Sequence, residues 1–537
     1  MVYILFHHDD WSTFSHINAN NMLKKSENHN PNYLAKVVKL GKPVQHPNAD
    51  RLLGWMIDGN RVWTDNVNYK EGDTVVYFPL ECQINPLILS QLNLFSSADQ
   101  NVDKTQKGFF DKNGRVRAIR LRGEPSEGFI LKPELLDHNG LLNWEGCIGK
   151  EFDIFDNTPF GDDFKNYKED ITWICKKYVL TRTQGAANSK KSPNKWKDII
   201  IENQFRFHYD TEQMKKHMNV INPDTIITIT KKIHGTSGIS SNVLSNVKET
   251  RFVKFIKKSL SLENYLLTFW LALIFCMQCN NSQSSWVIWG LYFPHVIAKI
   301  FNKKYRNFMD QLLCVPDVKE YNLISASRRV VKSVGDKFTN EGGYYKFDIW
   351  KYATDLYKNR IENGITLYYE IVGYLPNGAM IQKGYDYGCE PSNVDIIDGN
   401  IHYYEEGKQF KVQVYRITYT TLEGKVIEFS WEQIKDYCRH NDLTPVKEIF
   451  TGSARSFLPI QPGEDIDVWR QAFLNKISQN YFEEHDPECL NKVPAEGVVI
   501  RIENGRPEAY KFKSFLFLEQ ESKQLDSGEV DTETQES

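Results

Sequence analysis

Short runs of alternating apolar and polar residues, separated by turn signals, dominate the first third of the chain. Such runs occupy 34–40, 52–57 and 73–80, and alternation with a period of two is typical of half-buried strands. Asn113-Gly114 is a hairpin-turn signal between two further strand-like segments. Because these strands are short, closely spaced and lack helical periodicity, they predict a small β-barrel over 33–155.

The second half of the chain mixes strand-like and helix-like segments. The strand-like segments are 223–244, 365–376, 410–420, 495–505 and 508–517, and the helix-like segments are 342–363 and 468–482. Strands and helices follow one another irregularly, which predicts an α+β fold and not a doubly wound parallel sheet.

The remaining segments differ in composition from these two regions. Residues 1–32 are polar and Asn-rich, which predicts a flexible N-terminal arm, and 156–222 forms a charged linker region. We expect one ordered C-terminal domain over 223–518. The residues over 519–537 are acidic and poor in apolar side chains, which predicts a disordered tail.

An apolar insert near 250–320 raises the question of a membrane segment. Residues 265–277 are almost wholly apolar, and a second apolar stretch follows over 286–301. A spanning helix needs about 20 apolar residues, and the first run is shorter. We therefore expect one or two buried helices and no membrane anchor, with an interfacial helix as the alternative because basic residues and tryptophans lie nearby.

Whole-chain charge does not indicate a nucleic-acid-binding protein. The chain has 66 Lys and Arg against 69 Asp and Glu, a net charge of −3, so any basic surface must be local. The local candidate is the second predicted hairpin, which carries Arg115, Arg117, Arg120 and Arg122. Arg115 and Arg117 would share one strand face that suits a phosphate backbone, and an ordinary solvated strand face is an equal alternative.

Nine cysteines are scattered along the chain. Cys276 and Cys279 alone have zinc-type CxxC spacing, and no second pair completes a ligand set. An odd number of dispersed cysteines is typical of a reducing compartment, and the first residues lack a signal-peptide pattern. We expect an intracellular protein of a compartment such as the cytoplasm, with no obligate protein partner.

The strongest candidate for chemistry is a lysine at the end of a predicted strand. No Walker loop and no nucleophile elbow occur, so the common ATPase and hydrolase motifs are missing. Lys232 begins the sequence Lys-Ile-His-Gly directly after the strand-like run 225–230, a place from which an amine can attack a phosphate. Four further motifs follow in order: Ser327-Arg328, Glu370, the Glu496 of EGVVIRI, and the Lys511 and Lys513 of AYKFKS.

This order resembles the covalent nucleotidyltransferase superfamily of polynucleotide ligases and capping enzymes. The resemblance covers the C-terminal half, from Lys232 to Lys513, and the His-Gly-Thr-Ser that follows is similar to the nick-sealing branch of RNA ligases. Residues 46–52 and 115–129 resemble the OB-type domain that precedes the catalytic domain in one group of RNA-repair ligases. DNA ligases and capping enzymes carry an OB domain after the final lysine motif, and too few residues follow Lys513 here for one.

The resemblance assigns a role to each charged residue of the motifs. It implies that Lys232 forms a lysyl-AMP adduct with ATP and that Lys511 and Lys513 hold the α-phosphate. A lysine attacks as the free amine, and nearby positive charge favours that form. The resemblance also implies that Glu496 holds Mg²⁺ or Mn²⁺, hard cations that prefer carboxylate and water ligands.

The remaining candidate residues would contact the nucleotide. The resemblance implies that Arg328 binds a phosphate or the ribose, and that Glu370 binds the ribose hydroxyls or a metal-bound water. It also places His234 and Gly235 at the nucleotide, and Val412 or Tyr415 could supply the apolar face for adenine.

Three functions are therefore considered. The first is an ATP-dependent RNA ligase with an N-terminal OB-like domain, which seals 3′-OH/5′-phosphate breaks in nicked or broken RNA during repair. The second is an OB-containing nucleic-acid-binding protein with an inactive transferase domain, and the third is a capping-type guanylyltransferase. Lys231 precedes Lys232, so the sequence also raises the question of which lysine reacts; Lys232 has the KxxG register.

Overall fold

The computed structural model describes only part of the chain, namely residues 22–136, 143–155, 173–179, 196, 199–246, 319–335, 337–338, 345–392, 396–397, 400–401, 403–503, 505 and 507–528. Most of the expected arm, nearly all of the apolar insert, and Cys276 and Cys279 lie outside the described residues. Within these described ranges no helix has the length and apolar character needed to cross a membrane. The cysteines in the same ranges are buried free thiols.

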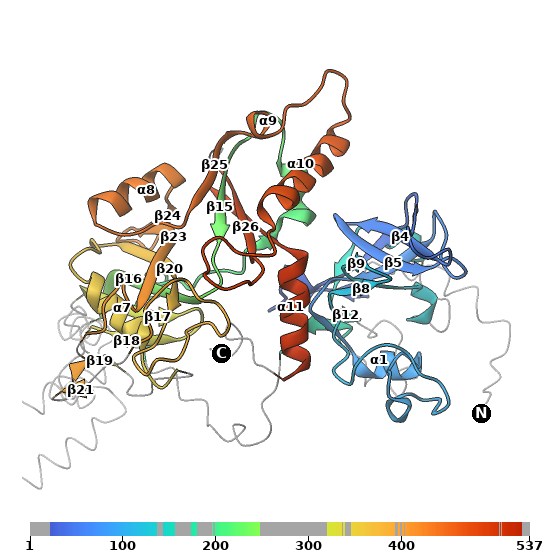
Figure 1. Ribbon diagram of the computed structural model, residues 1–537, viewed down its shortest axis with the longest axis horizontal. Helices are drawn as coiled ribbons and strands as arrows, with labels where there is room; N and C mark the ends of the chain where they lie inside the picture. The colour runs from blue at the N-terminus through green and yellow to red at the C-terminus, as the bar shows by residue number, and fades with distance from the viewer. Residues whose placement is uncertain are drawn as a thin grey trace, which may run out of the picture.

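The N-terminal region, residues 22–155, consists of several small antiparallel sheets (Figure 1). The largest is formed by β10 (Phe129–Leu131), β6 (Thr74–Phe78), β2 (Ala35–Lys39) and β11 (Glu151–Phe152). The others contain β3 (Val44–Gln45), β4 (Leu52–Ile57) and β5 (Asn60–Asp65); β8 (Ile119–Leu121) and β9 (Glu124–Ser126); and β1 (Leu23–Lys24) with β12 (Ile154–Phe155). The predicted small β-barrel is not confirmed, since the pairings among the described strands form separate sheets and do not close one barrel.

A hydrophobic core joins two of these sheets. Trp55 and Val62 of the three-stranded sheet pack against Val75 and Tyr77 of the four-stranded sheet. On the other side of β6, Phe78 belongs to a second core that also covers the helix α1 (Pro86–Gln91). The predicted β-rich domain is therefore present as small sheets around two cores.

Part of the expected linker region is built into the two larger regions. β13 (Cys175–Lys177) pairs with β7 (Cys82–Ile84) of the N-terminal region. β14 (Glu212–Gln213) pairs with a strand of the C-terminal region, and the 3₁₀ helix Met214–Val220 follows it. These segments therefore act as structural parts of the two regions they connect.

The first C-terminal sheet has seven strands. In order they are β19 (Lys337–Phe338), β18 (Val331–Val334), β17 (Lys319–Ser327), β16 (Thr236–Asn246), β20 (Ile365–Gly373), β23 (Phe410–Thr420) and β24 (Val426–Glu428). One large core covers this sheet and includes the fully buried Trp350 of α7 (Ile349–Tyr357) and Trp431 of α8 (Trp431–His440). The helix expected over 342–363 is shorter, because the Asp348 side chain caps it by accepting from the Lys351 N–H at 2.9 Å.

The second C-terminal sheet has five strands. In order they are β14, β27 (Glu508–Lys513), β26 (Gly497–Ile502), β15 (Ile226–Lys232) and β25 (Glu448–Ser453). The predicted helix over 468–482 is α10 (Ile466–Tyr481), and its buried Trp469 and Phe473 pack with Ile229 and Val498 of the sheet. The short helix α9 (Ala454–Phe457) joins the same core. Among the described strands, β14 with β27 is the one parallel pair, which confirms an α+β fold with antiparallel sheets.

The expected disordered tail is helical in its first part. The helix α11 (Phe515–Asp526) follows β27 directly and stands between the N-terminal and C-terminal regions (Figure 1). Ser514 caps it by accepting from the Phe517 N–H at 3.1 Å, and Phe517, Leu518 and Leu525 are buried. The prediction of disorder from residue 519 was therefore wrong up to Asp526, because composition alone did not reveal the buried apolar face.

The predicted turn at Asn113-Gly114 is present, and Gly114 has a φ of 62°. The segment after it makes only an isolated bridge between Arg115 and Gln83. The hairpin lies further on, where β8 and β9 are joined by Arg122 and Gly123 with φ values of 49° and 95°. Positive φ at both central residues is typical of a type I′ turn.

The arginines of this segment face α11. Arg115 has a side chain only 2% exposed, and its guanidinium lies 2.9 Å from the Glu81 carboxylate and 2.6 Å from Asp526. Arg117 pairs with Asp526 at 3.1 Å, and Arg120 pairs with Glu519 at 3.2 Å. The prediction that Arg115 binds a phosphate backbone is therefore wrong, because a helix covers it.

Arg117 and Arg120, which were also expected to bind nucleic acid, form ion pairs with the same helix. Arg122 is exposed in the β8–β9 turn. The strand face that Arg115 and Arg117 were expected to share is not formed, because β8 begins only at Ile119.

We expect Arg115 to hold α11 against the N-terminal region. Arg115→Ala leaves the carboxylates of Glu81 and Asp526 without their common cation and should cost about 3–5 kcal/mol of stability. Arg117→Ala removes a half-exposed pair and should cost about 1 kcal/mol or less. Hydrogen exchange of the α11 amides and denaturant unfolding measure both effects; equal losses in the two variants would contradict this role of Arg115.

The same ion pair predicts a pH dependence. Burial raises the pKa of Glu81 to about 7, although Arg115 lowers it. A carboxyl whose pKa is raised by folding favours the folded state most below its unfolded pKa of about 4.3, and this contribution is lost as the pH rises through about 7.

Glu81→Gln should therefore reduce the fall in melting temperature between about pH 5 and pH 8. The matched control is Glu71→Gln, which alters an exposed carboxylate of the same region and should leave the fall unchanged. If the melting temperatures of the wild type and of Glu81→Gln fell by the same amount across this pH range, the Glu81 carboxyl would not titrate as described.

Candidate active site

Three lysines share one face of the five-stranded sheet. Lys232 ends β15 opposite Gly497 of β26, and Gly497 lies opposite Lys513 of β27. Residues opposite one another on neighbouring strands point to the same face, so Lys232 and Lys513 flank Gly497. Lys511 lies two residues before Lys513 and points to the same face, because side chains alternate along a strand.

Gly497 allows this row of strands to form. Its φ is 144°, and a Cβ at this position would lie 2.2 Å from the carbonyl oxygen of Phe512. Any larger residue would push β26 away from β27, the strand that carries Lys511 and Lys513.

A buried carboxylate lies between the two end lysines. Glu496 has a side chain only 1% exposed, and its Oε1 lies 2.7 Å from Lys232 Nζ and 3.6 Å from Lys513 Nζ. Glu521 of α11 approaches Lys513 at 3.4 Å from the other side. A buried charge needs such partners to stay ionised, so these groups form one electrostatic unit.

Lys231 is separated from this unit. It lies opposite Val498, so its side chain points to the other face of the sheet from Lys232. Its Nζ is 3.0 Å from Asp486, and the two side chains are only 5% and 2% exposed. Lys231 is therefore part of a buried structural ion pair, and Lys232 is the lysine that faces the lysine row.

The seven-stranded sheet supplies the opposite wall. Ser237 of β16 lies opposite Glu370 of β20, and the Ser237 hydroxyl is 3.1 Å from the Tyr415 hydroxyl on β23. Burial raises the pKa of the Tyr415 phenol, and the nearby Glu370 carboxylate raises it further. Arg328 follows the last residue of β17.

Between the two sheets lies a pocket of about 90 Å³. Of the residues expected from the sequence, its lining includes Lys232, Arg328, Glu370, Tyr415, Lys511 and Lys513. The structure thus brings together residues from β15, β17, β20, β23 and β27. An amine, several cations and a carboxylate around one pocket suit the binding of a phosphorylated ligand beside a nucleophile.

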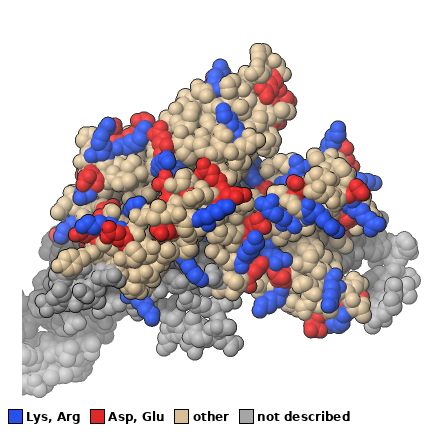
Figure 2. Space-filling model, viewed as in Figure 1, with Lys and Arg blue, Asp and Glu red and all other residues tan. Residues whose placement is uncertain are grey.

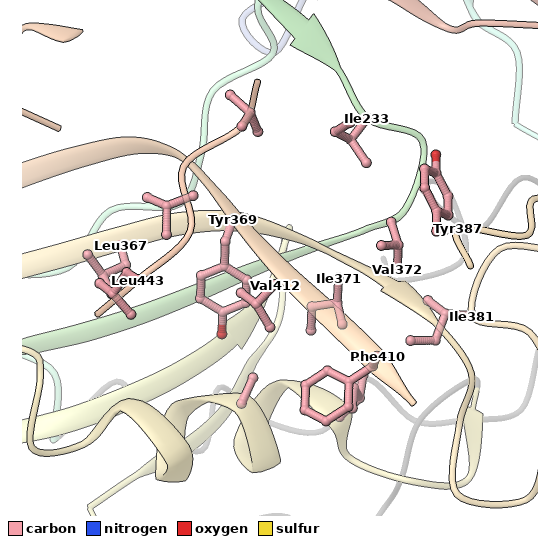
Figure 3. Close-up of a cluster of buried hydrophobic side chains, with 14 of the residues drawn as sticks. Ile233, Leu367, Tyr369, Ile371, Val372, Ile381, Tyr387, Phe410, Val412 and Leu443 are labelled. Carbon is pink, nitrogen blue, oxygen red and sulfur yellow. The ribbon is translucent and has the colours of Figure 1, made fainter. Parts of the chain in front are cut away.

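His234 and Gly235 lie just outside this pocket and shape the turn after Lys232. The His234 ring packs edge-on against Tyr385 and Phe517, at 4.7 and 4.8 Å between centroids. Its Nδ1 is 3.9 Å from Glu496 Oε2. The His234 N–H donates to the Tyr387 hydroxyl at 3.1 Å, and Figure 3 shows Tyr387 beside this turn.

Gly235 is required by close packing. A Cβ there would lie 2.5 Å from the carbonyl oxygen of Ile371, so the turn can approach β20 only because residue 235 has no side chain. His234 and Gly235 therefore support the turn, and their expected contacts with a nucleotide stay predictions.

Val412 is not part of the pocket lining. It is 1% exposed and belongs to the hydrophobic core beneath the sheet (Figure 3). Val412 and Tyr415 are three positions apart on β23, so they point to opposite faces. Val412 therefore cannot share the pocket with Tyr415, and the expected adenine contact of Val412 is wrong.

The expected linker region contributes a wall of the pocket that no sequence pattern predicted. The His208 ring lies 5.2 Å from the Tyr415 ring, and its Nδ1 is 3.3 Å from Arg416 Nη1. Burial lowers the pKa of His208 well below its usual value, and the positive charges of Arg416 and Arg328 lower it further. His208 is therefore neutral, and its Nδ1 accepts a hydrogen bond from the guanidinium.

Asp210, close to this pocket, forms an ion pair with Arg328. Burial opposes its ionisation, but Arg328 and Lys511 outweigh this effect and lower the pKa of Asp210 to about 2. Asp210 is thus charged at neutral pH and orients Arg328. No sequence signal marks these residues, because polar linker residues have no periodicity.

The residues present fit a divalent cation only if a ligand shares it. Among the described residues no group of three or more His, Cys, Asp and Glu could hold a metal alone. Mg²⁺ is usually bound by one or two carboxylates together with waters and substrate phosphates. The Glu496 carboxylate close to a pocket lined by several cations is compatible with that kind of site.

Comparisons with known proteins give only distant likenesses. No protein-family model matches the sequence, and no curated protein matches it. Solved structures of an RNA ligase from Naegleria gruberi are similar: a ligand-free variant and a variant with ATP and Mn each have 12% identity and a TM-score of 0.45, and cover 91% of this chain and 98% of that chain. The same ligase with pyrophosphate has 13% identity and a TM-score of 0.44, with 91% and 99% covered. A likeness this distant does not identify the function of this chain.

The two adjacent lysines should differ sharply in their structural role. Lys231→Met leaves Asp486 buried without its partner and should cost about 3–5 kcal/mol. Lys232→Met, at the edge of the pocket, should cost clearly less, because its side chain is 17% exposed and Glu496 keeps Lys513.

Denaturant unfolding of both variants measures this difference. Lys231→Met combined with Asp486→Leu removes both buried charges and should recover much of the stability that the single variant loses. A Lys231→Met variant as stable as wild type would show that the Lys231–Asp486 pair has no structural role.

Proposed function

We propose that this protein is an ATP-dependent RNA ligase that seals 3′-OH/5′-phosphate breaks through a lysyl-AMP intermediate. The observation that carries the proposal is the row of Lys232 and Lys513 around buried Glu496, with distances of 2.7 and 3.6 Å to Oε1. This row brings the Lys232 amine to a pocket that Lys511, Lys513 and Arg328 also line. The motif order from Lys232 to Lys513 assigns the same roles.

In the first step the chain forms its own adduct. Lys232 Nζ attacks the α-phosphorus of ATP, a P–N bond forms, the bond between the α-phosphorus and the bridging oxygen breaks, and pyrophosphate leaves. Glu496, the carboxylate 2.7 Å from Nζ, is the nearest acceptor for the proton that the ammonium group must lose. Lys511, Lys513 and Arg328 neutralise the charge on the phosphates.

A divalent cation fits beside Glu496 when the phosphates share it. When bound, Mg²⁺ or Mn²⁺ supplies positive charge that favours the free amine of Lys232 over its ammonium form. The carboxylate of Glu496 and that of Glu370 on the facing sheet are the residues placed to hold it, directly or through water.

The nucleoside of ATP would occupy the part of the pocket lined by Tyr415 and His208. Their rings lie 5.2 Å apart, edge to face, and offer an aromatic surface to a purine. Glu370 lies close enough to Tyr415 to influence its ionisation and is placed to accept hydrogen bonds from the ribose hydroxyls.

Two further transfers complete the proposed reaction. An oxygen of the RNA 5′-phosphate attacks the phosphorus of lysyl-AMP, which breaks the P–N bond and forms an adenylylated RNA end. The 3′-hydroxyl of the other end then attacks that 5′-phosphate, a phosphodiester forms and AMP leaves. We assign this activity to the repair of broken RNA, with the N-terminal region, expected to be OB-like, as the nucleic-acid-binding domain.

The adenylylation half-reaction tests this proposal directly. Incubation with α-labelled ATP and a divalent metal should give a labelled band in denaturing electrophoresis for the wild type. Lys232→Ala removes the nucleophile and should lose all label. The control is Lys476→Ala, which should keep the label, because Lys476 lies on α10 and donates a hydrogen bond to the Phe457 carbonyl. Glu496→Ala should lower labelling by about 100-fold or more.

The alternatives give different results in the same assay. If GTP and not ATP labelled the protein, the protein would be a capping-type guanylyltransferase and the ligase proposal would be wrong. A protein that is free of AMP beforehand and takes no label from either nucleotide would favour the nucleic-acid-binding protein with an inactive transferase domain.

A further inference from the structure

A wide groove separates the N-terminal region from α10. Its space of about 640 Å³ lies between the β3–β4–β5 sheet on one side and α10 on the other. In Figure 1 α10 and β4–β5 stand on opposite sides of this groove, with the start of α11 below them, and Figure 2 shows the surface indented there. Apart from Lys513, none of the residues that line this groove has a role in the proposed lysyl-AMP chemistry.

One face of the three-stranded sheet forms the first wall. Met56 of β4 lies opposite Arg61 of β5, and Gly54 lies between Val44 and Trp63 in the next row. Val44 is 48% exposed and Met56 is 44% exposed. This wall therefore offers apolar surface to a ligand, with an arginine beside it.

Positive charge exceeds negative charge along the groove. Its charged side chains are Arg61, Arg120, Lys215 and Lys513 against Glu124 and Glu127. Lys215 pairs with Glu127 at 2.8 Å, and Arg120 pairs with Glu519 at 3.2 Å. Arg61 is partly exposed and lines the groove, so its positive charge lies beside any ligand held there.

The opposite wall is uncharged. The side chains of α10 that line the groove are Gln471, Leu474, Asn475 and Ser478. Amides and a hydroxyl can donate to phosphate or sugar oxygens and bring no carboxylate that would repel them. An acidic wall would be expected for a basic peptide, so the charge pattern favours a polyanion.

The inner end of the groove reaches the active site. Lys513 lines both this groove and the ATP pocket, and a single carboxylate, Glu496, separates it from Lys232. A nucleic-acid strand bound along the groove would therefore end next to Lys232, the amine proposed to carry the adenylyl group.

We propose that this groove binds the single-stranded end of the RNA that is to be adenylylated, with bases against Val44 and Met56 and phosphates near Arg61. Apolar surface for bases together with cations for the backbone is the arrangement by which proteins bind single strands. The inference rests on the proposed ligase function and adds the path by which the substrate reaches Lys513.

A charge inserted into the α10 wall tests the proposal. Asn475 is exposed and lines the groove, whereas Gln461 is exposed before the start of the same helix and does not line it. With a short fluorescent single-stranded oligoribonucleotide, Asn475→Glu should raise the Kd about tenfold, because a carboxylate would face the phosphates. Gln461→Glu adds the same charge far from this wall and should change the Kd less than about twofold.

A second variant reports on the interaction with the RNA backbone. Arg61→Ala should reduce the slope of log Kd against log salt by about 0.7, the value expected when one phosphate of a single strand is no longer neutralised. Melting curves show whether each variant is folded. Equal binding by the Asn475→Glu and Gln461→Glu variants, an unchanged salt slope for Arg61→Ala, or no binding by the wild type overturns the groove assignment.

Labelling of the wild type by ATP is measured in parallel, so that the two proposals fail separately. If the wild type is labelled by ATP but the groove variants bind RNA as the wild type does, the ligase proposal stands and the groove assignment is overturned. If the groove variants weaken RNA binding but the wild type takes no label from ATP, the ligase proposal is overturned and the groove stands as a nucleic-acid-binding site.

Discussion

A carboxylate buried between two ammonium groups determines the arrangement of the active site. Glu496 is 1% exposed, and an isolated charge at such a place would cost several kcal/mol or lose its ionisation. Lys232 and Lys513 remove that cost only when β15, β26 and β27 are in register, and that register in turn needs Gly497. The chemistry and the pairing of the sheet are therefore the same constraint.

Much of this arrangement could be predicted from the sequence. The strands around Lys232, Glu370, Glu496 and Lys513 follow clear apolar patterns, and the order of the motifs predicted that these residues meet. Val412 shows what a pattern can settle by itself, since its odd separation from Tyr415 on one strand already excludes a shared face. His208 lay in a polar stretch without periodicity, so its place beside Tyr415 depended on tertiary structure.

The wrong predictions for Arg115 and for the acidic tail have one physical cause. Alternation in a sequence shows which residues point the same way, and it does not show what covers them. Arg115 faces outward from its own segment and is nevertheless 2% exposed, because α11 lies over it. The acidic composition that indicated a disordered tail reflects the same packing, since Asp526 and Glu519 are the partners of these arginines.

The position of α11 also decides how the molecule can be divided. Phe515 follows the strand that carries Lys513, while Asp526 is held by Arg115 of the N-terminal region. Cleaving the connection between the two regions would leave each fragment with half of a buried ionic network and an uncovered apolar surface. Such fragments should reassociate without a covalent link, which makes this chain a suitable scaffold for a split protein whose two parts are expressed separately.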